Sequence, residues 1–89
     1  MAKINFKQFK YFTDITQEHT DVIDVSRVFA DMLYQRGSGI VIHDLALRIY
    51  RSKGEMELNQ EELTILQKTA EQLCTPVFID SFKANIIND

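Results

Sequence analysis

The chain has 89 residues, a formal net charge of −3 and one cysteine. This length accommodates one domain, residues 1–89, and the single cysteine excludes an internal disulfide framework. The proportions of 45% hydrophobic and 26% charged residues are typical of a folded globular chain and exclude a disordered one.

The first residues carry lysines where a signal peptide would need an apolar stretch. The longest strictly aliphatic run is Ile40-Val41-Ile42, whereas a membrane-spanning helix needs about 20 apolar residues. We therefore expect a cytoplasmic protein with no membrane segment.

Residues 4–25 are predicted to form a β-hairpin. Apolar and polar side chains alternate over 11–15, and the β-branched residues of 22–25 favour a second strand. The polar stretch 16–19 is predicted to be the turn. Over 4–9 the alternation changes parity, so a single strand would need a bulge there, and a short helix is the competing interpretation.

A first helix is predicted over residues 26–35, where apolar side chains recur with helical spacing along one stripe. Asp24 or Ser26 can accept the unpaired backbone N–H groups at its start. Gly37 follows it, and glycine suits the left-handed conformation that often ends a helix.

A second helix is predicted over residues 40–51, with an apolar face that Leu47 and Tyr50 widen, so we expect it to be the most enclosed helix. Lys53-Gly54 ends it. The alternation over 55–58 predicts a short edge strand laid on the hairpin.

Two further helices complete the predicted fold. Asn59 and Glu62 form a capping signature for a third helix that ends near Leu73, and Thr75-Pro76 begins a fourth. The predicted class is α+β and mainly helical, with an N-terminal hairpin packed on about four short helices.

Cys74 is the candidate nucleophile. It precedes the fourth helix, whose N-terminus would stabilise a thiolate, and His43 could serve as its base. No local signature of a cysteine enzyme accompanies it, so a cysteine-dependent enzyme is a second alternative. We expect a buried, unreactive thiol and no catalytic residues.

Metal, calcium and phosphate sites are not expected, and no cofactor is predicted. A structural zinc site needs four Cys or His ligands at paired spacings, and this chain has three such residues, widely scattered. Residues 49–60 lack the oxygen ligands of a calcium loop, and 37–39 lack the lysine and the preceding strand of a phosphate loop. Asp44 is expected to pair with Arg48 instead. The candidate ligands considered are His19, Asp21, His43, Asp44 and Cys74.

A basic patch is the candidate for binding nucleic acid. It comprises Arg36, Arg48, Arg51 and Lys53, with Tyr50 interleaved. Domains that bind nucleic acid are usually basic overall, and this chain is net acidic. A small DNA- or RNA-binding regulator is therefore the first alternative and not the leading interpretation.

Most of the chain resembles small uncharacterised proteins of bacterial phage, prophage or mobile-element genomes. The resemblance lies in Lys3-Ile4-Asn5-Phe6-Lys7, the blocks 29–34 and 43–50, and Cys74-Thr75-Pro76. It implies a small binding or assembly accessory protein, in the host cytoplasm if phage-encoded, and it assigns no site residue.

The leading functional hypothesis is protein–protein interaction without enzymatic activity, as an accessory or adaptor. Six Phe and three Tyr exceed what a thin core should enclose, and exposed aromatics beside charge are typical of interfaces. A hairpin edge also offers unpaired backbone groups. We therefore predict a homodimer, in which the partner or self-association surface is formed by Ile4, Phe6, Phe9, Tyr11 and Phe12.

Overall fold

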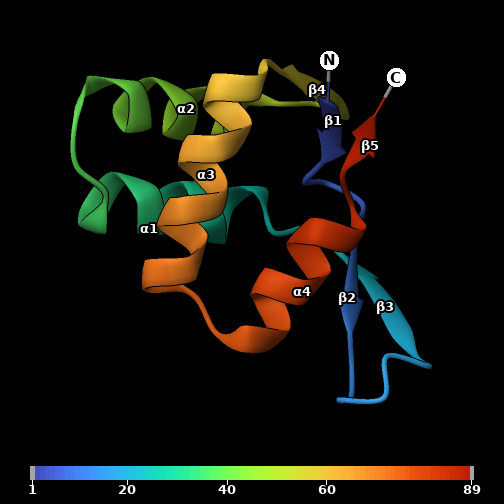
Figure 1. The fold of residues 1–89 in the computed structure, drawn as a ribbon. Helices are drawn as coiled ribbons and strands as arrows, with labels where there is room; N and C mark the ends of the chain where they lie inside the picture. The colour runs from blue at the N-terminus through green and yellow to red at the C-terminus, as the bar shows by residue number, and fades with distance from the viewer. Residues whose placement is uncertain (1, 89) are drawn as a thin grey trace.

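The computed structural model describes residues 2–88 and places two small antiparallel sheets against helices, which confirms the α+β class (Figure 1). The strands are β1 (Ala2–Asn5), β2 (Phe9–Phe12), β3 (Thr20–Ile23), β4 (Glu55–Leu58) and β5 (Ile87–Asn88). The helices are α1 (Ser26–Arg36), α2 (Ile40–Arg51), α3 (Gln60–Leu73) and α4 (Pro76–Ala84).

β1 lies between β4 and β5 and pairs antiparallel with both, so the two ends of the chain meet in one sheet. The edge strand predicted at residues 55–58 is confirmed as β4. It pairs with β1 and does not lie on the hairpin as predicted, because β2 and β3 form a separate two-stranded sheet.

A turn between β1 and β2 explains the change of parity that the sequence shows. The Asn5 side-chain oxygen accepts hydrogen bonds from the backbone N–H groups of Lys7 and Gln8, both at 3.0 Å. This turn redirects the chain so that Phe6 and Phe9 both point inward. The expected bulge and the competing short helix are both wrong, because two strands of different sheets meet there.

The helix boundaries follow the sequence signals closely. Asn59 and Glu62 exchange both hydrogen bonds of a capping box, and Thr75 accepts from the backbone of Phe78 at the start of α4. The Asp24 carboxylate accepts from the Ser26 backbone at 2.9 Å. None of the helices within residues 2–88 is long and apolar enough to cross a membrane.

Gly37 corrects one expectation, because its φ of −73° and ψ of 166° are extended and not left-handed. The left-handed glycine of this turn is Gly39, with a φ of 93°. Gly37 is required for space instead. A Cβ there would lie 2.3 Å from Ile42 Cγ2 and 2.5 Å from the Leu33 carbonyl oxygen.

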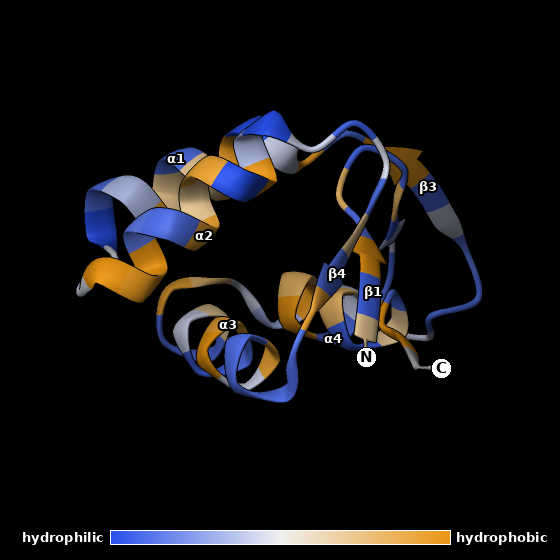
Figure 2. Ribbon diagram, turned by 90° about the horizontal axis from the view of Figure 1, so that it is seen from above, coloured by the Kyte–Doolittle hydropathy of each residue, from blue (hydrophilic) through white to orange (hydrophobic). Residues whose placement is uncertain are grey.

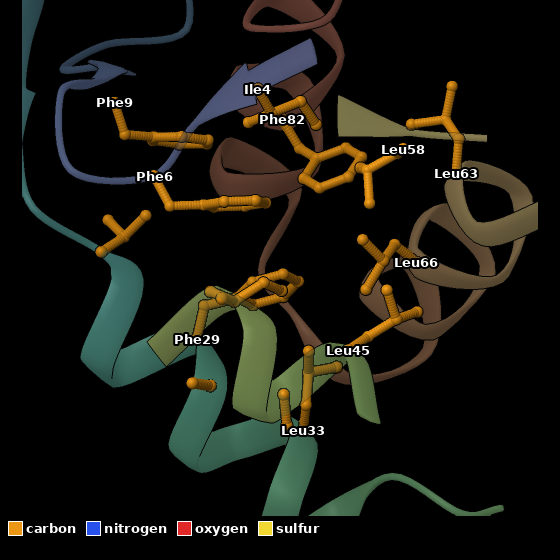
Figure 3. Close-up of a cluster of buried hydrophobic side chains, with 14 of the residues drawn as sticks. Ile4, Phe6, Phe9, Phe29, Leu33, Leu45, Leu58, Leu63, Leu66 and Phe82 are labelled. Carbon is orange, nitrogen blue, oxygen red and sulfur yellow. The ribbon is translucent and has the colours of Figure 1, made fainter. Parts of the chain in front are cut away.

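Viewed from above, α1 and α2 lie on one side of the molecule, α3 and α4 on the other, and the strands at one end (Figure 2). Phenylalanine and leucine side chains fill the space between these layers (Figure 3). Phe6 stacks on Phe29 with ring centroids 5.5 Å apart, and both rings contact Phe82. The core therefore encloses four of the six phenylalanines: Phe6, Phe9, Phe29 and Phe82.

This packing overturns the predicted contact surface. Ile4, Phe6 and Phe9 are fully buried, while Tyr11 and Phe12 are half-buried. The turn after β1 directs Phe6 and Phe9 into the core, although a chain of this length was expected to leave such rings near its surface. The grounds for predicting a homodimer through residues 4–12 are therefore removed.

Two helical residues also lie differently from the sequence pattern. Val28 belongs to the apolar stripe expected on α1 but is 72% exposed, because the stripe is wider than the face that α1 buries. Tyr50 was expected to widen the buried face of α2, yet it is 56% exposed.

Candidate functional site

The β2–β3 hairpin extends away from the other strands and ends in a loop (Figure 1); we call residues 9–23 the hairpin arm. Inside the loop, Asp14 accepts hydrogen bonds from the Thr16 hydroxyl at 2.8 Å and from the Gln17 backbone at 3.2 Å. The Gln17 side chain also donates to Asp80 of α4 at 3.3 Å. These bonds fix the loop and tie its tip to the middle of α4.

Helix α4 covers the outer edge of β2. The Lys10 backbone N–H donates to the Asn85 side-chain oxygen at 3.0 Å, and the Asn85 amide donates back to the Lys10 carbonyl at 2.8 Å. The Phe12 N–H donates to the Ser81 hydroxyl at 3.0 Å. Two side chains thus take the place of a neighbouring strand, and this edge cannot pair with another chain.

The opposite edge of the arm, formed by β3, is open. Alternate residues of an antiparallel strand bond to the neighbour. Since the backbone of Lys10 faces α4, the bonds between the two strands use the odd-numbered residues of β2, which lie opposite Asp21 and Ile23. The backbone groups of Thr20 and Val22 therefore point outward, and none of them is bonded within residues 2–88. All four side chains of β3 are exposed.

An apolar groove of about 360 Å³ adjoins β3. Ile23 enters it from the strand and Val28 from α1, and both side chains are exposed. Met32 and Cys74 meet in this groove with their sulfur atoms 3.5 Å apart, and such polarizable side chains adapt readily to a partner. The groove is lined by Tyr11, Ile23, Asp24, Val25, Val28, Phe29, Met32, Leu73, Cys74, Thr75 and Phe78.

A second groove, of about 640 Å³, lies between the tip of the arm and α4. Ile15 in its wall is 98% exposed, although an isolated aliphatic side chain gains nothing from contact with water. The hairpin arm is thus flanked by two hollows, with exposed aliphatic side chains on both. The second groove is lined by Tyr11, Phe12, Thr13, Asp14, Ile15, Gln17, Pro76, Val77 and Asp80.

The arm is acidic. Residues 9–23 hold three acids and one lysine, and from residue 11 to residue 26 the sequence has four acids and no lysine or arginine. Asp24 lies 3.6 Å from Lys7, and the hydrogen bonds from Ser26, more than this lysine, hold the pKa of its carboxyl below the usual value. Asp14 is 3.5 Å from His19. Asp21 has no ion-pair partner within the described part of the chain, and neither has Glu18 in the loop.

The structure separates the residues of the predicted basic patch. Arg36 ends α1 and Arg51 ends α2, and since the two helices are consecutive, a helix of 12 residues lies between these ends, about 18 Å. Arg48 forms an ion pair with Glu62 of α3 and donates to the Glu57 carbonyl at 3.1 Å. The predicted pairing of Arg48 with Asp44 is therefore wrong. Arg51 and the nearby Lys53 remain as a much smaller basic surface.

Cys74 caps the C-terminus of α3 and is half-buried, whereas the sequence predicted a buried thiol; this partial burial raises the pKa of the thiol. A raised pKa is the opposite of what a nucleophile requires. His43 lies beside Tyr34 instead, with ring centroids 5.6 Å apart. Within residues 2–88, no three His, Cys, Asp or Glu side chains gather where they could hold a metal ion.

A third groove, of about 250 Å³, runs between α1 and α2. Tyr34 and Tyr50 stand exposed on its rim, and Arg27 also lines it, which is the composition that interfaces favour. Sequence reasoning placed Tyr50 beside a basic patch and did not identify this groove or the open β3 edge. The stretch of 16 residues without lysine or arginine was the available signal for β3.

Comparison with known proteins matched the chain to no protein-family model, no curated protein and no solved structure.

Proposed function

We propose that this chain is a non-enzymatic protein-interaction protein, an accessory or adaptor of the kind encoded by phage, prophage or mobile elements, acting in the cytoplasm. The observation that carries the proposal is the open edge of β3 beside the apolar groove. Thr20 and Val22 offer unbonded backbone donors and acceptors there, and Ile23 and Val28 offer exposed aliphatic surface.

Strand addition is a common way for a partner to use such an edge. The backbone hydrogen bonds supply affinity, and pockets for alternate side chains supply specificity. A partner residue placed opposite Ile23 would have its Cβ about 5 Å away, at the mouth of the apolar groove. Both contributions are present on one side of the hairpin arm, whereas α4 closes the other side.

A proline substitution tests the edge without disturbing the arm. The Val22 N–H points away from β2, so Val22→Pro removes an outward donor and keeps every bond between β2 and β3. Val22→Thr is the matched control, because it keeps the N–H and changes only the exposed side chain. Circular dichroism and thermal unfolding should show both variants folded.

The assay is affinity capture from lysate of the cells that naturally produce the protein, with mass spectrometry. We expect a specific protein retained by the wild type and by Val22→Thr, and lost from Val22→Pro. As a second control, Val41→Thr changes an exposed aliphatic residue of α2 outside the apolar groove and should retain it. Partners that survive Val22→Pro unchanged would show that β3 is not the binding edge.

A further inference from the structure

We infer that the β3 edge takes up an extended, lysine- or arginine-bearing segment of a partner protein, which adds to the hairpin arm as a third strand. This inference rests on the proposed function and specifies the chemistry of the partner. It follows from three features of the described residues: the geometry of the edge, its charge, and the unsuitability of a second copy of the chain.

The edge geometry requires an extended chain. The outward N–H and C=O groups of Thr20 and Val22 lie two residues apart in one strand, which is the repeat that another β-strand presents. Competing edges are less available among residues 2–88. Ser81 and Asn85 cover β2, the Glu57 carbonyl of β4 already accepts from Arg48, and β5 has only two residues.

The charge at the edge favours a basic occupant. Asp21 lies in β3 itself on the same face as Ile23, and Glu18 lies in the adjoining loop; both are exposed and neither has an ion pair in the described chain. The nearby cations are placed differently. Lys7 is 3.6 Å from Asp24, and Lys10 belongs to β2, one strand further from the incoming segment, and shares the opposite face with Val22. Opposite charges across neighbouring strands stabilise the pair.

The same charges argue against a second copy of this chain as the occupant. Antiparallel pairing of two β3 strands about Asp21 would place this carboxylate directly opposite its equivalent. Pairing about Val22 avoids that contact but still brings two acidic arms together. Like charges opposite each other destabilise a strand pair.

The probe is a fluorophore-labelled peptide of about eight residues that alternates valine with lysine, titrated with the full chain and followed by fluorescence polarization. Two matched peptides accompany it: one with glutamate in place of lysine, and one with lysine but with alternate backbone nitrogens methylated. The first removes the charge complementarity and the second removes strand pairing.

We expect the lysine peptide to bind with a dissociation constant below about 1 mM, and the glutamate peptide to bind about tenfold more weakly or worse. The methylated peptide should not bind. Val22→Pro should reduce the affinity for the lysine peptide about tenfold, and Val22→Thr should leave this affinity unchanged. Asp21→Asn should reduce it about two- to fivefold. Raising the salt from about 50 to 500 mM should reduce the affinity.

Several results would overturn the inference, and they are distinct from failure of the proposed function. If Val22→Pro loses its lysate partner but the glutamate peptide binds as tightly as the lysine peptide, the edge binds a partner whose chemistry is not basic. No binding of the lysine peptide at millimolar concentration also contradicts a basic strand. Concentration-dependent dimers that Val22→Pro abolishes would make a second copy the occupant. Equal peptide binding by wild type and Val22→Pro would place the contact elsewhere.

Discussion

Substituting each of the three glycines by alanine tests how the turn between α1 and α2 is packed. In Gly37→Ala the new Cβ would lie 2.5 Å from the Leu33 carbonyl oxygen and 2.3 Å from Ile42 Cγ2. The backbone of Gly37 is extended and suits alanine, so the cost is steric. A side chain can rotate away, but a carbonyl that accepts the Gly37 N–H at 2.9 Å cannot move without lengthening that bond.

Overpacking a well-filled site costs about 1 to 3 kcal/mol, and we expect Gly37→Ala to cost about 2 kcal/mol. At about 4 to 8 °C per kcal/mol for a chain of this size, the midpoint of thermal unfolding should fall by about 8 to 16 °C. Urea titration measures the free energy of unfolding. If its dependence on urea concentration is unchanged by the substitution, the folded and unfolded states expose the same surface as in the wild type.

The other two glycines are the controls. Gly54→Ala meets no atom within 4 Å and should be neutral or stabilise by up to about 1 kcal/mol. Gly39→Ala also has free space, but its φ of 93° is strained for alanine and should cost about 1 to 3 kcal/mol. Replacing Ile42 by leucine removes the atom nearest the new Cβ, so Gly37→Ala should cost less in that background. Equal stability of Gly37→Ala and Gly54→Ala would refute the steric reasoning.

The remaining predictions concern the arm, the cap of α3, the thiol and the assembly. Asn85→Ala removes two hydrogen bonds to β2 and should lower the free energy of unfolding by about 1 to 2 kcal/mol in urea titrations. Glu62→Ala, which loses both the capping bond and the Arg48 ion pair, should destabilise more than Glu62→Gln, which keeps an oxygen for the cap. Because burial raises the pKa of Cys74, its contribution to stability is complete below the unfolded value near 9 and is lost as the pH rises through the folded value. Ellman's reagent should accordingly label the native thiol more slowly than the unfolded one. Light scattering should give a mass near 10.4 kDa up to high micromolar concentration, because Ile4, Phe6 and Phe9 of the predicted dimer contact are buried, and a doubling of the mass would contradict this.

Elements fixed by neighbours in the chain could be predicted from the sequence. The capping box of Asn59 and Glu62 spans four residues, and the Thr75-Pro76 start of α4 spans two. The bounds of α2 follow from an apolar face within 12 residues and from the glycines on either side. In each case the stabilising contact and the signal lie in the same short segment.

Features that depend on distant partners could not be predicted in this way. Arg48 pairs with Glu62, 14 residues away, although Asp44 lies at the ideal helical spacing. The burial of Phe6 and Phe9 depends on the turn at Asn5, which reverses the parity that a continuous strand would keep. For this reason Ile4, Phe6 and Phe9 are not available as the contact surface that the sequence predicted.

The rest of the chain covers one edge of the hairpin arm and leaves the other edge open, and this contrast supports a binding role for β3. Ser81 and Asn85, about 70 residues further along, cover β2. A single lysine or proline in β3 would discourage pairing of the other edge, yet that strand holds neither. An open edge with an exposed valine is normally an aggregation hazard. In the interaction that we propose, Asp21 and the adjoining acids would repel a second copy of the edge and attract a basic strand, so the same charges would disfavour self-association and select the partner.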